Sequence, residues 1–268
     1  MKAFLFPGQG SQRIGMGQGL FEAFPEITRA ANDILGYAIE DVCLRDPERR
    51  LGQTAYTQCA LYVVGALTHR QRTRETGERT SFTAGHSLGE YNALEYAGAM
   101  SFEDGLRLVQ KRGALMAAAP KGTMAAGIGL PAARIREILT ADNLTALDVA
   151  NLNAPTQTII SGPEADLARA QAAFERHKAM FIPLNVSGAF HSRYMQAARD
   201  AFADFVAGFR FATPKIPVIA NLTGAPYRED AIAETLSDQI THPVRWLETM
   251  QHLLRAGATD FVELGPGE

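Results

Sequence analysis

The stretch FTAGHSLGEYNALEYAG, residues 82–98, places a serine between two glycines where a short apolar run meets a helical pattern. Gly85, Ser87 and Gly89 fit the pattern Gly-x-Ser-x-Gly, which requires a sharp turn from a strand into a helix. Glycines on both sides let the two backbones approach closely, and the serine oxygen is exposed at the positive N-terminus of the helix. The stretch predicts a strand, a turn and a helix with Ser87 as a nucleophile. The alternative interpretation of Ser87 is an N-cap in a tight turn.

The composition limits the class of protein. The chain has 268 residues, 46% of them hydrophobic and 21% charged, which suffices for one substantial core with a small insertion. A formal net charge of −3 gives no reason to expect nucleic acid or an anionic membrane as partner. The apolar run at residues 3–6 ends at Pro7 and does not fit a secretion signal. Cys43 and Cys59 lack metal-binding spacing and are expected to be buried thiols. We expect a soluble cytoplasmic protein.

Strand-like and helical segments alternate along the chain. Residues 2–6 predict a strand, residues 59–72 a helix, and residues 80–85 a second strand. Residues 70–81 are polar and charged and predict a solvated connection, whereas residues 259–265 predict a last core strand. This alternation favours an α/β fold with a largely parallel sheet.

Residues 123–187 follow a different pattern. Their predicted order is strand, helix, strand, strand, helix, strand, which resembles a ferredoxin-like unit. We interpret this segment as a small subdomain inserted into a larger one formed by residues 1–122 and 188–268.

A nucleophilic serine requires a general base. His191 lies between a predicted strand and a predicted helix, a junction that lines the crevice at a sheet edge. His86 should point away from Ser87 across the turn, and His242 is expected in a loop. The other histidines fall among polar residues on predicted helices and are expected at the surface (His69, His177, His252). No aspartate stands out as a third member of a triad, so a dyad is possible.

The loop FPGQGSQ, residues 6–12, also follows a strand. A dinucleotide-binding loop would need glycine at position 13, where the chain has Arg13, so NAD binding is excluded. A rigid loop that presents Gln9, whose amide could donate to an oxyanion, fits better. The alternative is an ordinary strand-to-helix turn.

Residues 101–120 predict a helix with Ser101 as N-cap and Asp104 as its capping partner. At about 100° per residue, the large apolar side chains share one arc of this helix (Leu106, Leu108, Val109, Leu115, Met116). Arg112 falls inside that arc. A cation there costs several kcal/mol unless it is paired, so we expect either an internal ion pair, for example with Glu90, or a bidentate seat for a substrate carboxylate.

Eight motifs together resemble malonyl-CoA:acyl carrier protein transacylases and the acyltransferase domains of polyketide synthases. They occur in the same order and spacing and span nearly the whole chain: FPGQGSQ, GHSLGEYNAL, QKRGALM, GTMAAG, NLNAPTQTIISG, GAFHS, QITHPVRW and ELGPG. GAFHS and the start MKAFLFPGQG most resemble the discrete, trans-acting acyltransferases of polyketide assembly lines. The family extends a few tens of residues beyond GPG, so we expect this sequence to be truncated or cut from a longer chain.

The resemblance implies a catalytic set. Ser87 would be the acylated nucleophile and His191 its base, held by the backbone carbonyl of Gln239 in place of a carboxylate. Gln9 and the Leu88 backbone N–H would form the oxyanion hole.

It also implies the substrate contacts and the fold. Arg112 would bind the malonyl carboxylate, and Phe190 would narrow the pocket against α-substituted malonyl groups. The fold would be a hydrolase-like α/β core carrying a ferredoxin-like lobe, with the site between them.

We therefore predict an acyltransferase for polyketide or fatty acid synthesis. It would move a malonyl group from malonyl-CoA, through an ester on Ser87, to the phosphopantetheine thiol of an acyl carrier protein. The reaction would need no metal or cofactor. One alternative is an acyl hydrolase that clears carrier proteins, for which a buried Arg112 would have no use. Another is a carrier-binding scaffold with an inactive site, which the intact set of Ser87, His191, Gln9 and Arg112 argues against.

Overall fold

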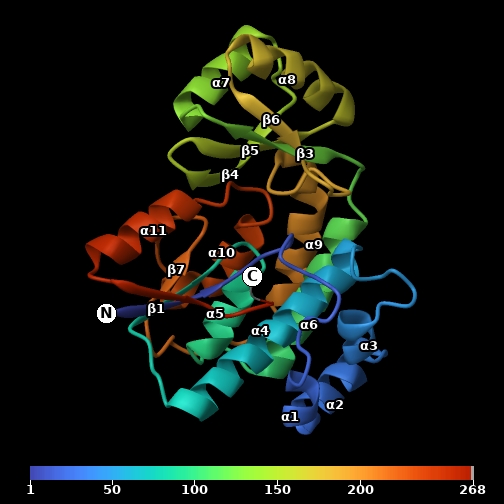
Figure 1. Cartoon of the computed structure of the whole chain (residues 1–268), viewed down its shortest axis with the longest axis vertical. Helices are drawn as coiled ribbons and strands as arrows, with labels where there is room; N and C mark the ends of the chain where they lie inside the picture. Colours follow the sequence, from blue (N-terminus) through green and yellow to red (C-terminus); the bar gives the residue numbers. More distant parts are fainter. Residues whose placement is uncertain (267–268) are drawn as a thin grey trace.

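The computed structural model describes residues 1–266 and contains two separate sheets (Figure 1). The larger sheet has the strand order β8-β7-β2-β1-β9. All its pairings are parallel except the β7–β8 hairpin. Its strands are β1 (Lys2–Phe6), β2 (Phe82–Gly85), β7 (Val218–Ala220), β8 (Ala225–Pro226) and β9 (Asp260–Glu263). The predicted α/β class and the largely parallel sheet are confirmed.

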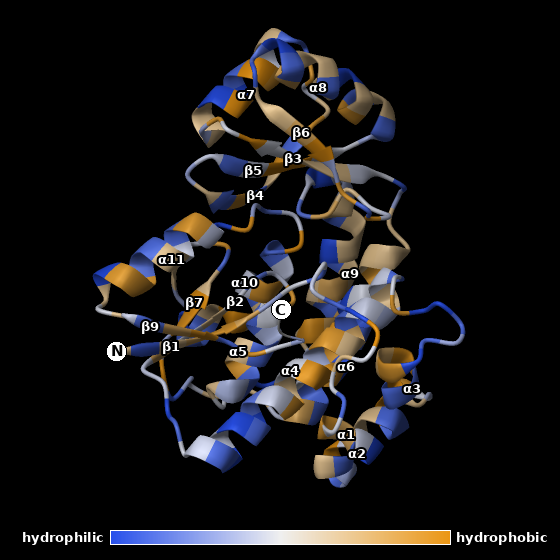
Figure 2. Cartoon of the chain, in the orientation of Figure 1, coloured by the Kyte–Doolittle hydropathy of each residue, from blue (hydrophilic) through white to orange (hydrophobic). Residues whose placement is uncertain are grey.

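Helices cover both faces of the larger sheet. Alternation along β1 turns Phe4 and Phe6 toward the main core and Ala3 toward a smaller one. The main core is built largely from α4 (Thr54–Thr76), α5 (Gly89–Tyr96), α6 (Phe102–Ala117) and α9 (Gln196–Val206), and hydrophobic residues gather where α4, α5 and α6 meet (Figure 2). On the opposite face α11 (Trp246–Arg255) packs Leu253 against the strands.

The remaining helices complete the larger unit. They are α1 (Leu20–Ala23), α2 (Pro25–Leu35), α3 (Ile39–Leu44) and α10 (Ile232–Asp238), with short 3-10 turns at Arg193–Met195 and Glu229–Ala231. No helix within residues 1–266 is both long and apolar enough to cross a membrane.

The smaller sheet is antiparallel with the order β4-β5-β3-β6. Its elements are β3 (Thr123–Ile128), α7 (Ala132–Ala141), β4 (Asp148–Ala154), β5 (Gln157–Gly162), α8 (Glu164–Arg176) and β6 (Met180–Pro183). The order of strands and helices is the predicted one. Ile135 and Phe174 of the two helices join a core of their own on one face of this sheet, whereas Met124 and Ile159 belong to the main core on the other face.

Two local expectations are wrong. Residues 70–81 do not form a connection from their start, because α4 continues to Thr76 and ends where Gly77 adopts φ 64°. His69 is not on the surface: it is 7% exposed and lies 2.7 Å from Glu95, which also binds Arg70. The polar composition of this segment reflects partly buried ion pairs and an exposed helix face rather than loss of the helix.

The predicted last strand is present as β9, but it is an edge strand with exposed or half-buried residues rather than a core strand. Gly267 and Glu268, which close the GPGE segment, lie outside the described residues.

Candidate active site

The serine turn is held by close backbone packing. Ser87 has φ 52°, in the left-handed region. A Cβ atom on Gly85 would lie 1.8 Å from the carbonyl carbon of Gly89, and one on Gly89 would lie 2.1 Å from the carbonyl oxygen of Phe6. Only glycine fits at both positions, so β2 can turn directly into α5 beside β1.

The side chain of Asn221 braces this turn. Its Oδ1 accepts from the Ser87 N–H at 2.6 Å, and its Nδ2 donates to the Gly85 carbonyl at 2.8 Å. The N-cap interpretation of Ser87 is wrong, because α5 begins at Gly89 and its N-cap position is Leu88. The Ser87 hydroxyl therefore does not cap α5 and is available to side chains of the cavity.

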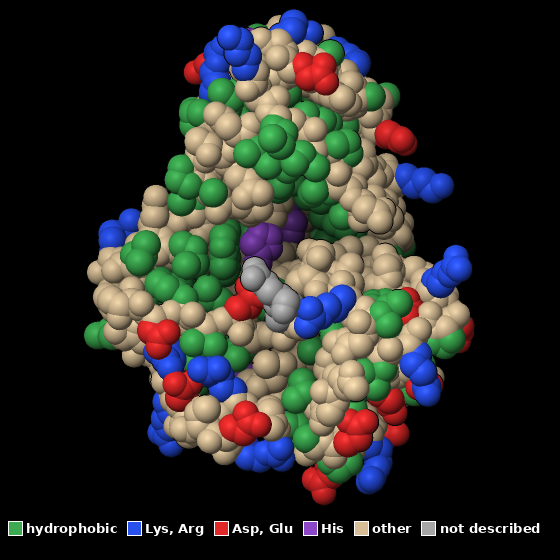
Figure 3. Space-filling view, in the orientation of Figure 1, with side chains coloured by type: hydrophobic (Ala, Val, Ile, Leu, Met, Phe, Trp, Pro, Cys, Tyr) green, Lys and Arg blue, Asp and Glu red, His purple; other side chains and the backbone are tan. Residues whose placement is uncertain are grey.

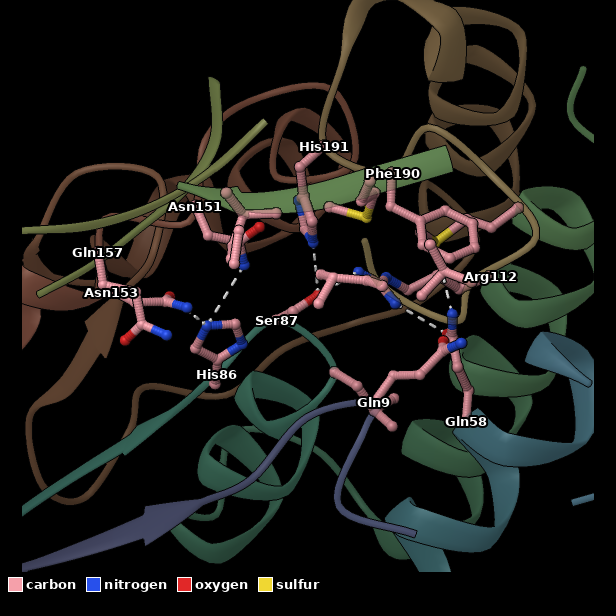
Figure 4. Close-up of a pocket in the computed structure, with 17 residues that line it drawn as sticks. Gln9, Gln58, His86, Ser87, Arg112, Asn151, Asn153, Gln157, Phe190 and His191 are labelled. Carbon is pink, nitrogen blue, oxygen red and sulfur yellow. Dashed lines mark hydrogen bonds between the residues drawn. The ribbon is translucent and has the colours of Figure 1, made fainter. Parts of the chain in front are cut away.

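Ser87 and His191 meet across 104 residues of sequence (Figure 4). Ser87 Oγ lies 2.7 Å from His191 Nε2, and His191 Nδ1 lies 2.8 Å from the backbone carbonyl oxygen of Gln239. A carbonyl can only accept, so Nδ1 carries the proton and Nε2 is the acceptor. Burial, with the Arg112 charge nearby, lowers the pKa of His191 to about 3. At neutral pH the imidazole is therefore uncharged and able to take the Ser87 proton.

Arg112 is 1% exposed and lies beside the serine. Its Nη1 donates to Gln58 Oε1 at 2.8 Å, and its Nη2 donates to Gln239 Oε1 at 2.8 Å and to Ser87 Oγ at 3.0 Å. Its Nε has no hydrogen-bond partner within residues 1–266. Burial lowers the pKa of Arg112 from its usual value. The direct ion pair with Glu90 is not formed among these residues, since the Gln239 amide lies between the two groups.

These groups line a cavity of about 270 Å³ between the two sheets. Histidine side chains are visible in the hollow that separates the small-sheet lobe from the larger lobe (Figure 3). The larger unit contributes Gln9, Gln58, His86, Ser87, Leu88, Arg112, Met116, Phe190 and His191. The small-sheet segment and the chain leaving it contribute Met124, Ala126, Asn151, Asn153, Gln157, Ile159, Leu184 and Val186.

Gln9 and Leu88 both line this cavity, and each carries a backbone N–H. Within the described chain neither N–H donates to a protein acceptor. The side-chain amide of Gln9 instead donates to Thr54 Oγ1 at 3.2 Å. If Gln9 serves an oxyanion, its backbone N–H is therefore the available donor.

Comparison with known proteins identifies the family. Residues 3–267 match the model described as "Acyl transferase domain". The chain is 48% identical over its full length to the polyketide biosynthesis malonyl CoA-acyl carrier protein transacylase BaeC of Bacillus velezensis and covers 93% of it. The chain belongs to the malonyl-CoA:acyl carrier protein transacylase family.

Two further relatives show the range of this transacylase family. The chain is 53% identical to the polyketide biosynthesis protein ThaF of Burkholderia thailandensis, but all of it spans only 23% of that protein. A solved malonyl CoA-acyl carrier protein transacylase from Burkholderia pseudomallei is 45% identical, with a TM-score of 0.96 over 100% of this chain and 94% of that one. The fold is therefore that of the transacylase family.

All seven site residues that the sequence predicted lie close together in this structure. Ser87, His191, Arg112, Gln9, Leu88 and Phe190 line the cavity, and Gln239 contacts His191 and Arg112 from beneath it. Residues 1–266 contain no group of three or more His, Cys, Asp or Glu side chains placed to hold a metal ion.

His86, which the sequence predicted to point away from Ser87, nevertheless lies at the cavity. Its ring lines the same cavity as Ser87, with Nε2 3.0 Å from Asn153 Oδ1 and the ring centroid 5.4 Å from that of Trp246. Burial lowers the pKa of His86. Asn153 and Asn151, whose Nδ2 lies 3.4 Å from the same ring nitrogen, belong to β4 and to the motif NLNAPTQTIISG, for which the sequence suggested no role.

Besides His86, five buried or cavity-lining polar residues were not predicted as part of the site: Gln58, Asn151, Asn153, Gln157 and Asn221. Gln58 offered a weak signal, since it is a polar residue directly before the apolar run CALYVVGAL of α4. Asn221 lies directly after β7, a strand of three residues, and no sequence pattern identified it.

Proposed function

We propose that this chain transfers a malonyl group from malonyl-CoA, through an ester on Ser87, to the phosphopantetheine thiol of an acyl carrier protein in polyketide or fatty acid synthesis. The observation that carries this proposal is a buried guanidinium beside the nucleophile, with Arg112 Nη2 at 3.0 Å from Ser87 Oγ. A cation in that place suits an acyl group that ends in a carboxylate.

The first half-reaction acylates the enzyme. His191 Nε2 takes the proton of Ser87 Oγ as this oxygen attacks the thioester carbon. The backbone N–H groups of Gln9 and Leu88 hold the resulting oxyanion. The C–S bond then breaks, and the imidazolium returns its proton to the departing CoA thiolate.

The second half-reaction reverses these steps with a new thiol. His191 takes the proton of the phosphopantetheine thiol, whose sulfur attacks the Ser87 ester carbonyl. The ester C–O bond breaks and Ser87 Oγ recovers a proton from the imidazolium. Neither half-reaction requires a metal or a redox cofactor.

Two further residues have roles in this proposal. Gln239 orients His191 through its backbone carbonyl. Phe190 limits substituents on the malonyl α-carbon. It directly precedes His191 in the sequence, is 5% exposed and lines the cavity.

The same proposal divides the chain into a large subdomain (residues 1–122 and 188–268) and a small one (residues 123–187), with the substrate between them. It also assigns the protein to the cytoplasm, where the free, buried thiols of Cys43 and Cys59 suit a reducing environment.

Intact-protein mass spectrometry after incubation with malonyl-CoA alone tests the proposal. We expect a single malonyl adduct on the wild type and none on Ser87→Ala. Ser161→Ala is the control, since Ser161 is a fully buried serine on β5 that does not line the cavity, and it should still label. An adduct on Ser87→Ala would reject the nucleophile.

The hydrolase alternative is decided by the fate of that adduct. A transferase ester should persist in buffer and disappear when a carrier protein bearing phosphopantetheine is added. Rapid loss to water without the carrier would favour the hydrolase. Failure of the wild type to label at all would leave the inactive scaffold as the better interpretation.

A further inference from the structure

Glu90 is a buried carboxylate next to the site that the mechanism does not use. It lies in the first turn of α5, three residues after Ser87, and is 0% exposed. Its Oε1 accepts from the Asn221 backbone N–H at 2.7 Å and from the Tyr227 hydroxyl at 3.0 Å, and its Oε2 accepts from Gln239 Nε2. Within residues 1–266 it forms no direct ion pair.

The Gln239 amide joins Glu90 to Arg112. Gln239 Nε2 donates to Glu90 and, at 2.9 Å, to the Ser87 carbonyl, whereas Gln239 Oε1 accepts from Arg112 Nη2 at 2.8 Å. With a carboxylate on one side and a guanidinium on the other, only one orientation of the amide is favourable. The opposite orientation would place an NH₂ group against the guanidinium and an oxygen against the carboxylate.

This spacing keeps Arg112 available. A direct pair with Glu90 would occupy two guanidinium N–H groups, as bidentate pairs do. With the amide between them, Glu90 accepts from Gln239 rather than from Arg112, and Arg112 Nε retains its free N–H. The guanidinium is thus held in place by two amide oxygens, those of Gln58 and Gln239, and can still receive a second carboxylate.

A second arm of Glu90 reaches the serine turn. The carboxylate binds the backbone N–H of Asn221, and the Asn221 side chain bridges Ser87 and Gly85. Displacement of Glu90 would therefore shift both the cation and the nucleophile.

We propose that Glu90 is a positioning residue that sets the orientation of the Gln239 amide, and through it the direction of Arg112, so that the site prefers acyl groups carrying a carboxylate. The inference rests on the proposed transferase function. Glu90 is not among the residues that line the cavity, and it acts only through Gln239 and Asn221.

The test is Glu90→Gln, because it keeps the size of the side chain and changes its hydrogen bonding. If the new amide places its oxygen toward Asn221 and Tyr227, its NH₂ group meets that of Gln239, which then favours the reversed orientation. Arg112 loses one of its two amide acceptors. We expect the malonyl-CoA to acetyl-CoA ratio of kcat/KM to fall at least about tenfold, the change expected when a hydrogen bond to a charged group is lost.

Glu95→Gln is the matched control. Glu95 lies on the same helix, is 8% exposed and binds His69 and Arg70 away from the cavity. This variant should lose thermal stability with an unchanged malonyl to acetyl ratio. A Glu90→Gln enzyme that is also less stable but keeps the wild-type ratio would overturn the inference and leave Glu90 a purely structural residue.

Gln239→Met keeps the test decisive if Glu90→Gln does not fold. Methionine preserves the length and the backbone carbonyl that holds His191, but it removes both ends of the amide relay. We expect the same fall in the malonyl to acetyl ratio, and an unchanged ratio would overturn the inference. Labelling of the wild type by malonyl-CoA separates the proposed function from the role of Glu90. If the wild type does not label, the proposed function is contradicted. If it labels normally but the variants keep the wild-type ratio, only the role of Glu90 is contradicted.

Discussion

Replacement of Arg112 by alanine should remove the preference of the site for malonyl-CoA over acetyl-CoA. Arg112 is 1% exposed, and its nearest polar contacts are Gln58, Gln239 and Ser87. In the acyl complex the substrate carboxylate would pair with this guanidinium out of bulk water. Loss of one partner of a buried ion pair costs about 3–5 kcal/mol, which corresponds to roughly a hundred- to several-thousandfold loss of kcat/KM for malonyl-CoA.

The effect on acetyl-CoA should be much smaller. Acetyl groups have no carboxylate to leave unpaired, so we expect less than about a tenfold change, the size of one modest hydrogen-bond rearrangement. The amide oxygens of Gln58 and Gln239 lose a charged donor in the folded protein. Because water can enter the vacated volume, we expect the free energy of unfolding to fall by only about 2–3 kcal/mol.

The assay compares kcat/KM for both thioesters in the wild type, Arg112→Ala and Arg107→Ala. Arg107 is the matched control, since it lies on the same helix, is exposed and pairs with Asp104 at the surface. Thermal denaturation of each variant accompanies the kinetics. Equal losses for malonyl-CoA and acetyl-CoA in Arg112→Ala, with a large drop in melting temperature, would refute the carboxylate seat and return the hydrolase to consideration.

Three other substitutions or conditions have defined outcomes. Phe190→Ser should raise the methylmalonyl to malonyl ratio of kcat/KM about tenfold to a hundredfold, since overpacking costs about 1–3 kcal/mol; a constant ratio would reject Phe190 as the size filter. Gly85→Ala should lower the free energy of unfolding, measured with urea, by more than about 4 kcal/mol, because its Cβ would lie 1.8 Å from the Gly89 carbonyl carbon. Gly52→Ala is the neutral control, since a Cβ there would have nothing within 4 Å. Equal stabilities of the two variants would contradict the close packing at Gly85. Burial raises the pKa of Glu90 from 4.5 to about 7. Between these pH values the folded state retains a proton that the unfolded chain releases. The stability that this proton contributes is complete below pH 4.5 and is lost as pH rises through 7. Between these pH values the unfolding free energy of the wild type should fall relative to that of Glu90→Gln, by up to about 3 kcal/mol, and parallel curves would contradict it.

The sequence predicted those parts of the fold that depend on local patterns. Gly-x-Ser-x-Gly identified the turn because the pattern itself is local, although Gly85 is required by its contact with Gly89 and Gly89 by its contact with the distant Phe6. The projection of residues 101–120 identified Arg112 because a cation on an apolar arc is visible from periodicity alone. Ser101 caps α6 as expected, accepting from the Asp104 N–H at 3.0 Å.

The partners of these residues could not be predicted in the same way. Gln58 and Gln239 approach Arg112 from segments 54 and 127 residues away, and local periodicity states which face is buried but not what it meets. Glu90 was considered only as a direct ion-pair partner, whereas an amide separates it from Arg112. The extent of α4 was missed because charged residues that form ion pairs with distant groups resemble a solvated loop in composition.

Both members of the proposed dyad occupy the left-handed region, with φ 52° at Ser87 and 55° at His191. Such a conformation costs of order 1–3 kcal/mol at a non-glycine residue, and glycine adopts it without strain. Ser87→Gly is therefore among the substitutions that should make the fold more heat-resistant while abolishing its chemistry, whereas His191→Gly would also remove a buried side chain that is 4% exposed and leave a cavity. A library selected for thermostability alone would drift toward glycine at position 87, so directed evolution of this scaffold requires an activity screen in every round.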